Sequence, residues 1–260
     1  MSDTGPGHDP IRGRTALVTG AGNGLGRAMA LTLGARGARV VLVGRRAQTL
    51  GEVAAEIDGP TRTAVCDTSS PEQVAALGEE LAGEEVSILV NNAGIAGPVA
   101  SLIDVTPSEW DEVFAVNVRG VYLMCRQFLP PMVARGAGDV VNIASVSGKR
   151  PLPNRTPYAA SKMAVIGLST TLAYEVGPAG VMVNTLSPGP VSGPRMTRNF
   201  ALEAERSHTS VQEAERAFVS RAALGRMVTE SEVAAALVAM LQMPGLCGAD
   251  IDLSAGMVAR

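Results

Sequence analysis

The sequence predicts an α/β protein with one open, doubly wound, predominantly parallel sheet of seven strands and helices on both faces. Two observations support this prediction. Short aliphatic and β-branched runs recur along the chain, and amphipathic stretches of helical length separate them. Runs that are apolar throughout are typical of parallel strands buried on both faces, which right-handed helical crossovers connect. The 260 residues, of which 46% are hydrophobic and 18% charged, suit one large domain with a sizeable core.

The expected strands share this apolar composition, and turn-forming residues follow most of them. In chain order they are Thr15–Thr19, Arg39–Val43, Thr61–Cys66, Val86–Val90, Asp139–Ile143, Val181–Leu186 and Asp250–Leu253. The expected helices carry apolar residues at helical spacing, and a proline in its first turn favours the start of the third. They are Leu25–Ala35, Ala47–Ile57, Pro71–Leu81, Pro107–Val118, Val121–Ala134, Thr156–Gly177 and Glu230–Met243.

Two segments interrupt the alternation of strands and helices. Residues 1–13 contain Gly, Pro, Asp and His without an apolar run, which predicts a flexible N-terminal tail and no signal peptide. Residues 14–260 are then expected to form one domain. Pro188–Thr229 is too long for a simple connection, so we expect a lid over a binding site at about residues 190–229.

Composition excludes several classes of function. The net charge of −3 gives no indication of a nucleic-acid or anionic-membrane partner, and no apolar run is long enough to span a bilayer. The three cysteines have no paired spacing, which favours a reduced compartment and a cytoplasmic location. Two histidines are too few for a multi-histidine metal site or a histidine-centred hydrolytic triad, so we expect no metal.

The residues from Thr19 to Gly26 read Thr-Gly-Ala-Gly-Asn-Gly-Leu-Gly and lie between the first strand and the first helix. Glycines let the backbone approach a pyrophosphate, and a helix N-terminus supplies free N–H groups. The spacing Gly-x-x-x-Gly-x-Gly differs from the common dinucleotide fingerprint, and any tight turn can use glycine. The position after the first strand still predicts a Rossmann-like dinucleotide site. The expected contacts are Gly20, Gly22, Asn23, Gly24, Leu25 and Gly26.

The end of the second strand indicates which dinucleotide binds. An acidic residue there suits the ribose 2′-hydroxyl of NAD, whereas arginine suits the 2′-phosphate of NADP. The chain has Arg45 and Arg46 at this place and no carboxylate before Glu52. NADP is therefore the expected cofactor, with NAD as the alternative if the two arginines only face solvent.

Tyr158 and Lys162 are four residues apart on an expected helix, which places them on one face, and Ser145 precedes them. A free tyrosine is a poor base at neutral pH because its pKa is about 10, but a nearby ammonium favours the phenolate. Two such charges about 4 Å apart interact by roughly 4 kcal/mol at an effective dielectric of about 20. The spacing alone also fits an ordinary helix face with a lysine that extends to solvent.

Together these features resemble the short-chain dehydrogenase/reductase family over about residues 12–258. The matching positions are Thr19–Gly26, Asn91–Gly94, Asn117, Ser145, Tyr158, Lys162 and Pro188–Gly189. The resemblance implies that Asp67 contacts the adenine. It further implies that the cofactor lies against Asn91, Ala93, Gly94, Pro188, Gly189 and Val191.

The resemblance also implies the catalytic roles. Tyr158 would be the general acid or base, Ser145 would bind the substrate oxygen, and Lys162 would bind the nicotinamide ribose. Asn117 would hold a water that passes protons to Lys162. The chain departs from the family at Ser192, where Thr is common, and in the last residues, where the family often has Val-Asp-Gly-Gly.

The expected function is reversible hydride transfer between NADP and a carbonyl or secondary alcohol. The alternatives are an NAD-dependent alcohol dehydrogenase of the same family and a non-catalytic dinucleotide-binding sensor, which would need no proton relay. A sugar-nucleotide epimerase would usually have a larger C-terminal domain. The resemblance implies a homotetramer or homodimer through the helices that begin at Val121 and Thr156.

The substrate pocket is expected from Ile95–Ala100, Gly148–Thr156 and the lid. Basic residues in these segments suggest an acidic substrate, although most surface arginines are simply solvated. They are Lys149, Arg150, Arg155, Arg195 and Arg198.

Overall fold

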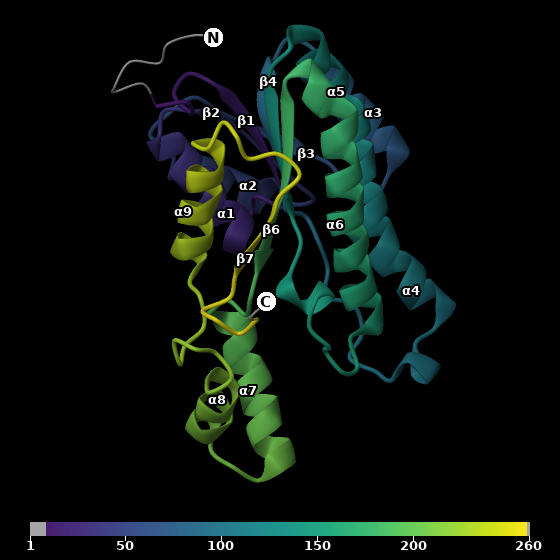
Figure 1. Ribbon diagram of the computed structural model, residues 1–260, viewed down its shortest axis with the longest axis vertical. Helices are drawn as coiled ribbons and strands as arrows, with labels where there is room; N and C mark the ends of the chain where they lie inside the picture. The colour runs from purple at the N-terminus through teal and green to yellow at the C-terminus, as the bar shows by residue number, and fades with distance from the viewer. Residues whose placement is uncertain (1–8, 259–260) are drawn as a thin grey trace.

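The computed structural model of the protein describes residues 9–258, without the side chains of residues 194 and 195. The described residues form a seven-stranded parallel sheet in the order β3-β2-β1-β4-β5-β6-β7, which confirms the expected fold (Figure 1). The strands are β1 (Thr15–Thr19), β2 (Arg39–Gly44), β3 (Thr61–Val65), β4 (Val86–Asn91), β5 (Gly138–Ile143), β6 (Val181–Pro188) and β7 (Asp250–Leu253).

Helices cover both faces of the sheet (Figure 1). One face packs against α1 (Gly24–Ala35), α2 (Ala47–Ala54) and α9 (Glu230–Leu241). The other packs against α3 (Pro71–Glu80), α5 (Gly120–Arg135) and α6 (Thr156–Val176). Within β1, Ala16 and Val18 belong to the first core and Leu17 to the second, as the two-residue period of a strand requires.

The order of the strands determines where a ligand site is expected. The chain moves outward from β1 to β2 and β3, then returns to the other side of β1 with β4. Ligands of open α/β sheets bind at such a reversal, outside the carboxyl ends of the strands. The glycine-rich turn follows β1, Asn91 ends β4, Ser145 follows β5 and Pro188 ends β6, so the sheet collects these residues along one edge.

The two helices expected at Pro107–Val118 and Val121–Ala134 are one continuous helical rod. α4 (Pro107–Phe114) leads into a π-helical turn, Ala115–Arg119, and then into α5. Phe114 and Gly120 on either side keep right-handed helical dihedral angles, so the helix is not broken there. π turns insert one residue into a helix and are frequent at functional sites. The inserted turn contains Asn117.

Residues 9–13, which were expected to belong to a flexible tail, are packed against the domain. Ile11 is fully buried, and the N–H of Gly13 donates to the Gly37 carbonyl at 2.9 Å. Asp9 pairs with Arg36 at 3.1 Å. The apolar Ile11 was too isolated in the sequence to predict this contact. Residues 1–8 lie outside the described residues.

The segment expected as a lid forms two helices, α7 (Pro194–Ser207) and α8 (Val211–Val219). They project from the carboxyl edge of the sheet (Figure 1). Met196, Phe200, Ala204 and Ala214 form a separate small core between them. The remaining elements are short 3₁₀ turns at Leu102–Asp104, Val146–Gly148 and Gly177–Ala179.

Candidate active site

The turn between β1 and α1 is shaped by contacts that exclude side chains. Gly20 has a φ of +65°, and a Cβ there would lie 2.9 Å from Asn92 Nδ2. A Cβ on Gly26 would lie 2.1 Å from the Gly20 carbonyl oxygen. Asn23 precedes α1 without a side-chain cap, and the first turn holds no acidic residue. The N–H groups and positive dipole at this helix end therefore remain available, which suits a pyrophosphate.

Thr19 and Asn92 fix this turn to β4. The Thr19 hydroxyl accepts hydrogen bonds from the N–H groups of Asn92 and Ala93 at 2.9 and 3.0 Å. The Asn92 amide donates to the Thr19 carbonyl at 2.9 Å. The sequence analysis gave neither side chain a role. The feature of the sequence that indicates this role is Asn92, directly after Asn91. Its short polar side chain is able to join two adjacent strand ends.

Arg45 and Arg46 lie next to the glycine-rich turn, because Gly22 packs against Thr49 and the Thr49 hydroxyl donates to the Arg46 carbonyl at 3.1 Å. Both arginines are exposed. Arg46 occupies the N-cap position of α2 without a capping hydrogen bond from its side chain, and the first turn of α2 has no acidic residue. Within the described residues neither arginine forms an ion pair, so both guanidinium groups are available to an anion.

Asp67 follows β3 on the same edge. Its carboxylate accepts hydrogen bonds from the N–H and hydroxyl of Ser69 at 2.9 and 2.7 Å. These bonds, helped by the charges of Arg45 and Arg119, hold the pKa of the Asp67 carboxyl below its usual value. The carboxylate thus stays ionised at neutral pH and retains acceptor capacity for a ligand amine.

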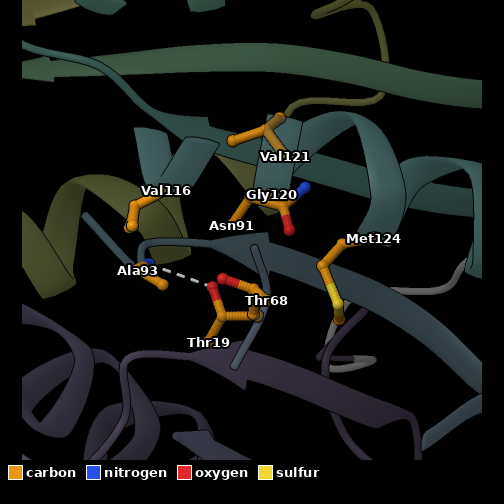
Figure 2. Close-up of a pocket in the computed structure, with 8 residues that line it drawn as sticks. All are labelled: Thr19, Thr68, Asn91, Ala93, Val116, Gly120, Val121 and Met124. Atoms are coloured by element: carbon orange, nitrogen blue, oxygen red, sulfur yellow. Dashed lines mark hydrogen bonds between the residues drawn. The ribbon is translucent and has the colours of Figure 1, made fainter. Parts of the chain in front are cut away.

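Asn91 directs its amide into the interface between the sheet and α5 (Figure 2). Its Nδ2 donates to Asn142 Oδ1 at 2.8 Å and to Cys125 Sγ at 3.4 Å, whereas its Oδ1 is buried without a partner. Burial raises the pKa of the Cys125 thiol to about 12, so this cysteine is not a nucleophile. The crevice there, lined also by Thr68 and Gly120, is too narrow for a water molecule. A contact between Asn91 and a cofactor would therefore involve its backbone.

Lys162, Tyr158 and Ser145 meet at the carboxyl end of β5. The Lys162 ammonium donates to the Ile143 carbonyl at 2.8 Å and lies 5.8 Å from the centre of the Tyr158 ring. Lys162 is buried, while Tyr158 is half-buried and open to a ligand. The Ser145 hydroxyl accepts from the Ser147 N–H at 3.1 Å and donates to the Pro188 carbonyl at 3.4 Å. An ammonium, a phenol and a hydroxyl are thus placed around one edge of the sheet.

Asn117 joins the site to the loop after β4. Its Oδ1 accepts from the Ile95 N–H at 2.8 Å, and its Nδ2 donates to the Ile95 carbonyl at 2.9 Å and to Ser161 Oγ at 3.0 Å. A Cβ on Gly94 would lie 3.2 Å from Asn117 Oδ1 and 3.5 Å from Lys162 Nζ. Gly94 therefore lies close to both groups, and a side chain at this position would crowd Asn117. Ser161, which the sequence analysis did not select, connects Asn117 to the helix of Tyr158.

Pro188, Gly189 and Val191 form the entrance to the lid. The Gly189 N–H donates to the Leu253 carbonyl at 2.7 Å, and a Cβ on Gly189 would lie 2.8 Å from Ser254 Cα. Val191 forms a parallel bridge with Val228, where the chain leaves the lid. The Ser192 N–H donates to the Val228 carbonyl at 2.8 Å. Entry and exit of the lid are thus paired in a two-stranded neck.

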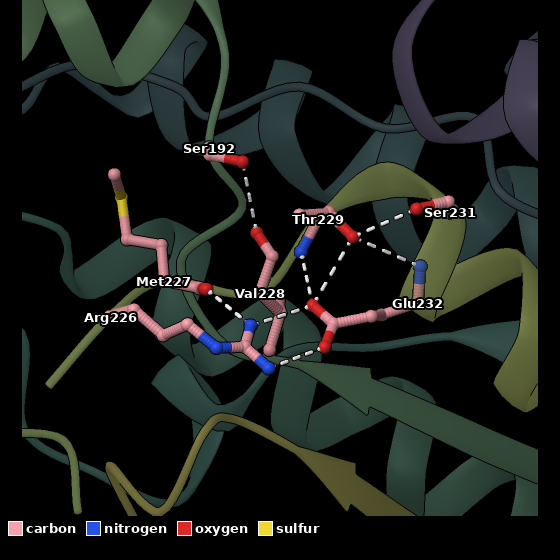
Figure 3. Close-up of polar contacts among 7 residues, drawn as sticks. All are labelled: Ser192, Arg226, Met227, Val228, Thr229, Ser231 and Glu232. Atoms are coloured by element: carbon pink, nitrogen blue, oxygen red, sulfur yellow. Dashed lines mark hydrogen bonds and ion pairs between the residues drawn. The ribbon is translucent and has the colours of Figure 1, made fainter. Parts of the chain in front are cut away.

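The exit side of this neck is held by Arg226 and Glu232 (Figure 3). Arg226 Nη2 pairs with Glu232 Oε1 at 2.6 Å. The other Glu232 oxygen accepts from the N–H of Thr229 at 2.8 Å, which completes a capping box at the start of α9. The hydrogen bonds from Arg226 and Thr229 lower the pKa of the Glu232 carboxyl to about 2.

Three comparisons place the chain among known proteins. The sequence profile described as short chain dehydrogenase matches residues 14–205. D-threitol dehydrogenase of Mycolicibacterium smegmatis (strain ATCC 700084 / mc(2)155) is 38% identical over 183 residues, which cover 68% of this chain and 70% of that protein.

Two solved structures extend the similarity to nearly the whole chain. NAD⁺-bound xylitol dehydrogenase aligns with a TM-score of 0.87 at 27% identity, over 95% of this chain and 99% of that one. A variant of actinorhodin polyketide ketoreductase with NADPH aligns with a TM-score of 0.85 at 31% identity, over 94% and 97%.

The protein belongs to the short-chain dehydrogenase family. It is therefore an oxidoreductase of the dehydrogenase/reductase type that acts on alcohols or carbonyl compounds with a nicotinamide dinucleotide. Among residues 9–258, no group of three His, Cys, Asp or Glu side chains is arranged to hold a metal ion. The helices in this range are too short or too polar to cross a bilayer.

The basic residues that were expected around the substrate pocket lie in different environments in the structure. Lys149 is turned away from solvent and pairs with Asp250 and Asp252, so it does not bind substrate. Arg155 donates to the Gly97 carbonyl at 3.1 Å and joins two of the expected pocket segments. Arg150 is half-buried and Arg198 exposed, while the side chain of Arg195 lies outside the described residues.

Proposed function

We propose that the protein catalyses reversible hydride transfer between NADP and a carbonyl compound or secondary alcohol. The observation that carries this proposal is the convergence of Tyr158, Lys162 and Ser145 on the sheet edge that also holds the glycine-rich turn. The cofactor supplies or accepts the hydride when bound. The chain supplies binding, orientation and proton transfer.

The residues present fit a dinucleotide. The uncapped amino end of α1 and the glycine-rich turn suit the pyrophosphate, and Asp67 suits the adenine amine. Arg45 and Arg46 are exposed cations next to the turn that form no ion pair among the described residues, although the charge of Arg45 acts on Asp67. They support a 2′-phosphate, and therefore NADP over NAD.

In the reducing direction, the Tyr158 hydroxyl would donate a proton to the oxygen of the carbonyl group as its carbon gains the hydride. In oxidation the same oxygen of Tyr158 would take the proton from the alcohol. Ser145 would donate a hydrogen bond to the substrate oxygen and stabilise its developing charge. The Lys162 ammonium, held at the Ile143 carbonyl, would bind the nicotinamide ribose. A water held by Asn117 would pass protons to Lys162, and through it to and from Tyr158.

Replacing Tyr158 tests the assignment most directly. In Tyr158→Phe the ring and its packing remain, while the transferable proton is lost. We expect kcat to fall by about a thousandfold, because general acid–base catalysis contributes roughly 10²–10⁴-fold. The measurement is turnover of NADPH and NADH with a panel of ketones and keto acids, and of NADP⁺ and NAD⁺ with alcohols. Tyr174→Phe, an exposed tyrosine on the same helix, is the matched control and should retain full activity. Equal rates for wild type and Tyr158→Phe would disprove the assignment.

Cofactor choice is tested separately with Arg45→Ala. Loss of a guanidinium that pairs with a phosphate should weaken NADPH binding by about tenfold and leave NADH binding unchanged. Titration of both cofactors by fluorescence measures this. Arg36→Ala removes an arginine from the opposite end of α1 and serves as control. If wild type binds NADH more tightly, the NAD-dependent alternative is correct.

The proposed assembly is a homodimer or homotetramer formed through α5 and α6. The outer faces of these helices enclose a groove of about 540 Å³. It is lined mainly by apolar side chains, including exposed Tyr122, buried Leu129 and half-buried Leu168 and Leu172. A second copy would cover this surface. Light scattering of wild type and Leu172→Glu measures the oligomeric state.

A further inference from the structure

Lys149 is buried although it comes directly after the turn of Ser145. It closes the 3₁₀ turn Val146–Gly148, with its N–H donating to the Val146 carbonyl at 3.0 Å. Only 2% of its side chain is exposed. Its ammonium lies 2.5 Å from Asp250 Oδ2 and also contacts Asp252 Oδ1. One lysine thus binds two carboxylates of β7.

This contact spans three strands of the sheet. Lys149 belongs to the segment after β5, while Asp250 and Asp252 lie on one face of β7, and β6 runs between these strands. The intervening Ser187 of β6 also takes part, because its hydroxyl donates to Asp250 Oδ1 at 2.7 Å. In the pairing of β6 with β7, Ser187 lies opposite Asp252, and the next pair is Pro188 opposite Leu253. The ion pair therefore ties the Ser145 turn to the strand ends that begin the lid.

On this side the turn of Ser145 is otherwise joined to β6 by its backbone, since the N–H of Ala144 donates to the Leu186 carbonyl at 2.8 Å. The hydrogen bond from the Ser145 hydroxyl to the Pro188 carbonyl is long, at 3.4 Å. On its other side the turn packs against α6, where a Cβ on Gly148 would lie 3.1 Å from the Met163 N–H nitrogen. The turn is thus held between the helix that carries Tyr158 and Lys162 and the ion pair on β7.

Stability alone does not account for this arrangement. Two carboxylates and one ammonium leave an uncompensated negative charge, and taking charges out of water costs free energy that apolar side chains avoid. A charged contact does fix a geometry, because the ammonium must stay within reach of both carboxylates. Such a fixed geometry is useful where a catalytic hydroxyl has to be placed to within a fraction of an ångström.

We propose that Lys149, bound to Asp250 and Asp252, is a positioning residue that fixes the Ser145 turn relative to Tyr158 and to Pro188–Gly189. This inference rests on the proposed function, in which Ser145 binds the substrate oxygen. Lys149 acts through Ser145 and touches neither substrate nor cofactor.

The test is the coupling between Lys149 and Ser145. We expect Lys149→Met to lower kcat by about tenfold, with the dissociation constant of NADPH changed by less than about twofold, because the cofactor-binding turn is elsewhere. In a Ser145→Ala background the same substitution should lower kcat by less than about twofold, since the hydroxyl that it positions is gone. If Lys149→Met does not fold, Asp252→Asn replaces it. This variant keeps the pair between Lys149 and Asp250, so kcat should fall in the same direction but by less.

Arg14→Met is the matched control. This substitution removes the largely buried ion pair between Arg14 and Asp139, whose charged atoms are 2.7 Å apart. Arg14 directly precedes β1 and Asp139 lies at the start of β5, so the pair is far from the carboxyl edge of the sheet. The substitution should lower the melting temperature without lowering kcat at a temperature where the protein is folded. Folded Lys149→Met and Asp252→Asn with wild-type kcat would overturn the inference. Equal fold-losses in the wild-type and Ser145→Ala backgrounds would also overturn it. If Ser145→Ala itself retains full kcat, the proposed role of Ser145 fails, which is a distinct result.

Discussion

The turn after β1 and the segment expected as a lid both lie at the carboxyl edge of the sheet, and they are held in different ways. The turn is joined to β4 by side-chain and backbone hydrogen bonds, and it packs on strands whose apolar side chains are fully buried. The lid has a core of four buried residues and is paired to the domain through a narrow neck. If the proposed function holds, the cofactor would bind to a surface fixed by the sheet and the substrate next to a segment with a small core of its own.

Sequence patterns reflect this difference. Every strand and the helices around the sheet were predicted because packing on a sheet imposes a regular spacing of apolar residues. α7 and α8 were not predicted, since their few apolar residues stand in a mostly charged segment. The two helices bury these residues against each other, as Phe200 against Phe218, whose ring centres are 5.4 Å apart. The burial of Lys149 was also missed. Its partners, Asp250 and Asp252, are about a hundred residues away in the sequence, and no local pattern relates them.

The largest effect is expected at the preformed turn, in Gly26→Ala. The added methyl group would meet the Gly20 carbonyl oxygen at 2.1 Å, so α1 or the turn must shift. Overpacking of this kind costs about 1–3 kcal/mol. We expect a melting temperature several degrees lower and NADPH affinity reduced by about a hundredfold, because the turn that binds the pyrophosphate is displaced. Calorimetry and fluorescence titration measure both.

Gly51→Ala is the control for this change. Gly51 lies within α2, and no atom is within 4 Å of the position of its Cβ. Alanine there should stabilise the protein by about 0.5–1 kcal/mol, since glycine is a poor helix former. Tight NADPH binding by Gly26→Ala would show that the turn is not preformed around the cofactor.

An effect confined to the lid, with no change in NADPH affinity, is expected from Phe200→Ala in α7. Phe200 is 4% exposed and is the largest side chain in the small core of the lid. Its removal should cost roughly 3 kcal/mol, which this core cannot recover elsewhere. Amides of residues 196–219 should then exchange faster with solvent, while those of β1 and β4 keep their protection. If protection falls equally in both regions, the lid and the sheet unfold as one unit.

The smallest effect is expected at the neck, where Glu232 is an acid-sensitive contact. Its hydrogen bonds with Arg226 and Thr229 lower the pKa of the carboxyl from 4.5 to about 2. A pKa that is lower in the folded protein means that the contact stabilises above about pH 4.5 and is lost as the pH falls toward about 2. The protection of the amides of residues 226–232, relative to the unfolded chain at the same pH, should therefore fall across this window in wild type. In Glu232→Gln this protection should already be lower at neutral pH and should change less with pH. Glu213→Gln, which alters the equivalent capping box of α8, should leave the neck amides unaffected. Because Glu232 is solvent-exposed, the effect should weaken at high salt, whereas an unchanged pH profile in Glu232→Gln would assign the acid sensitivity of the neck to another group.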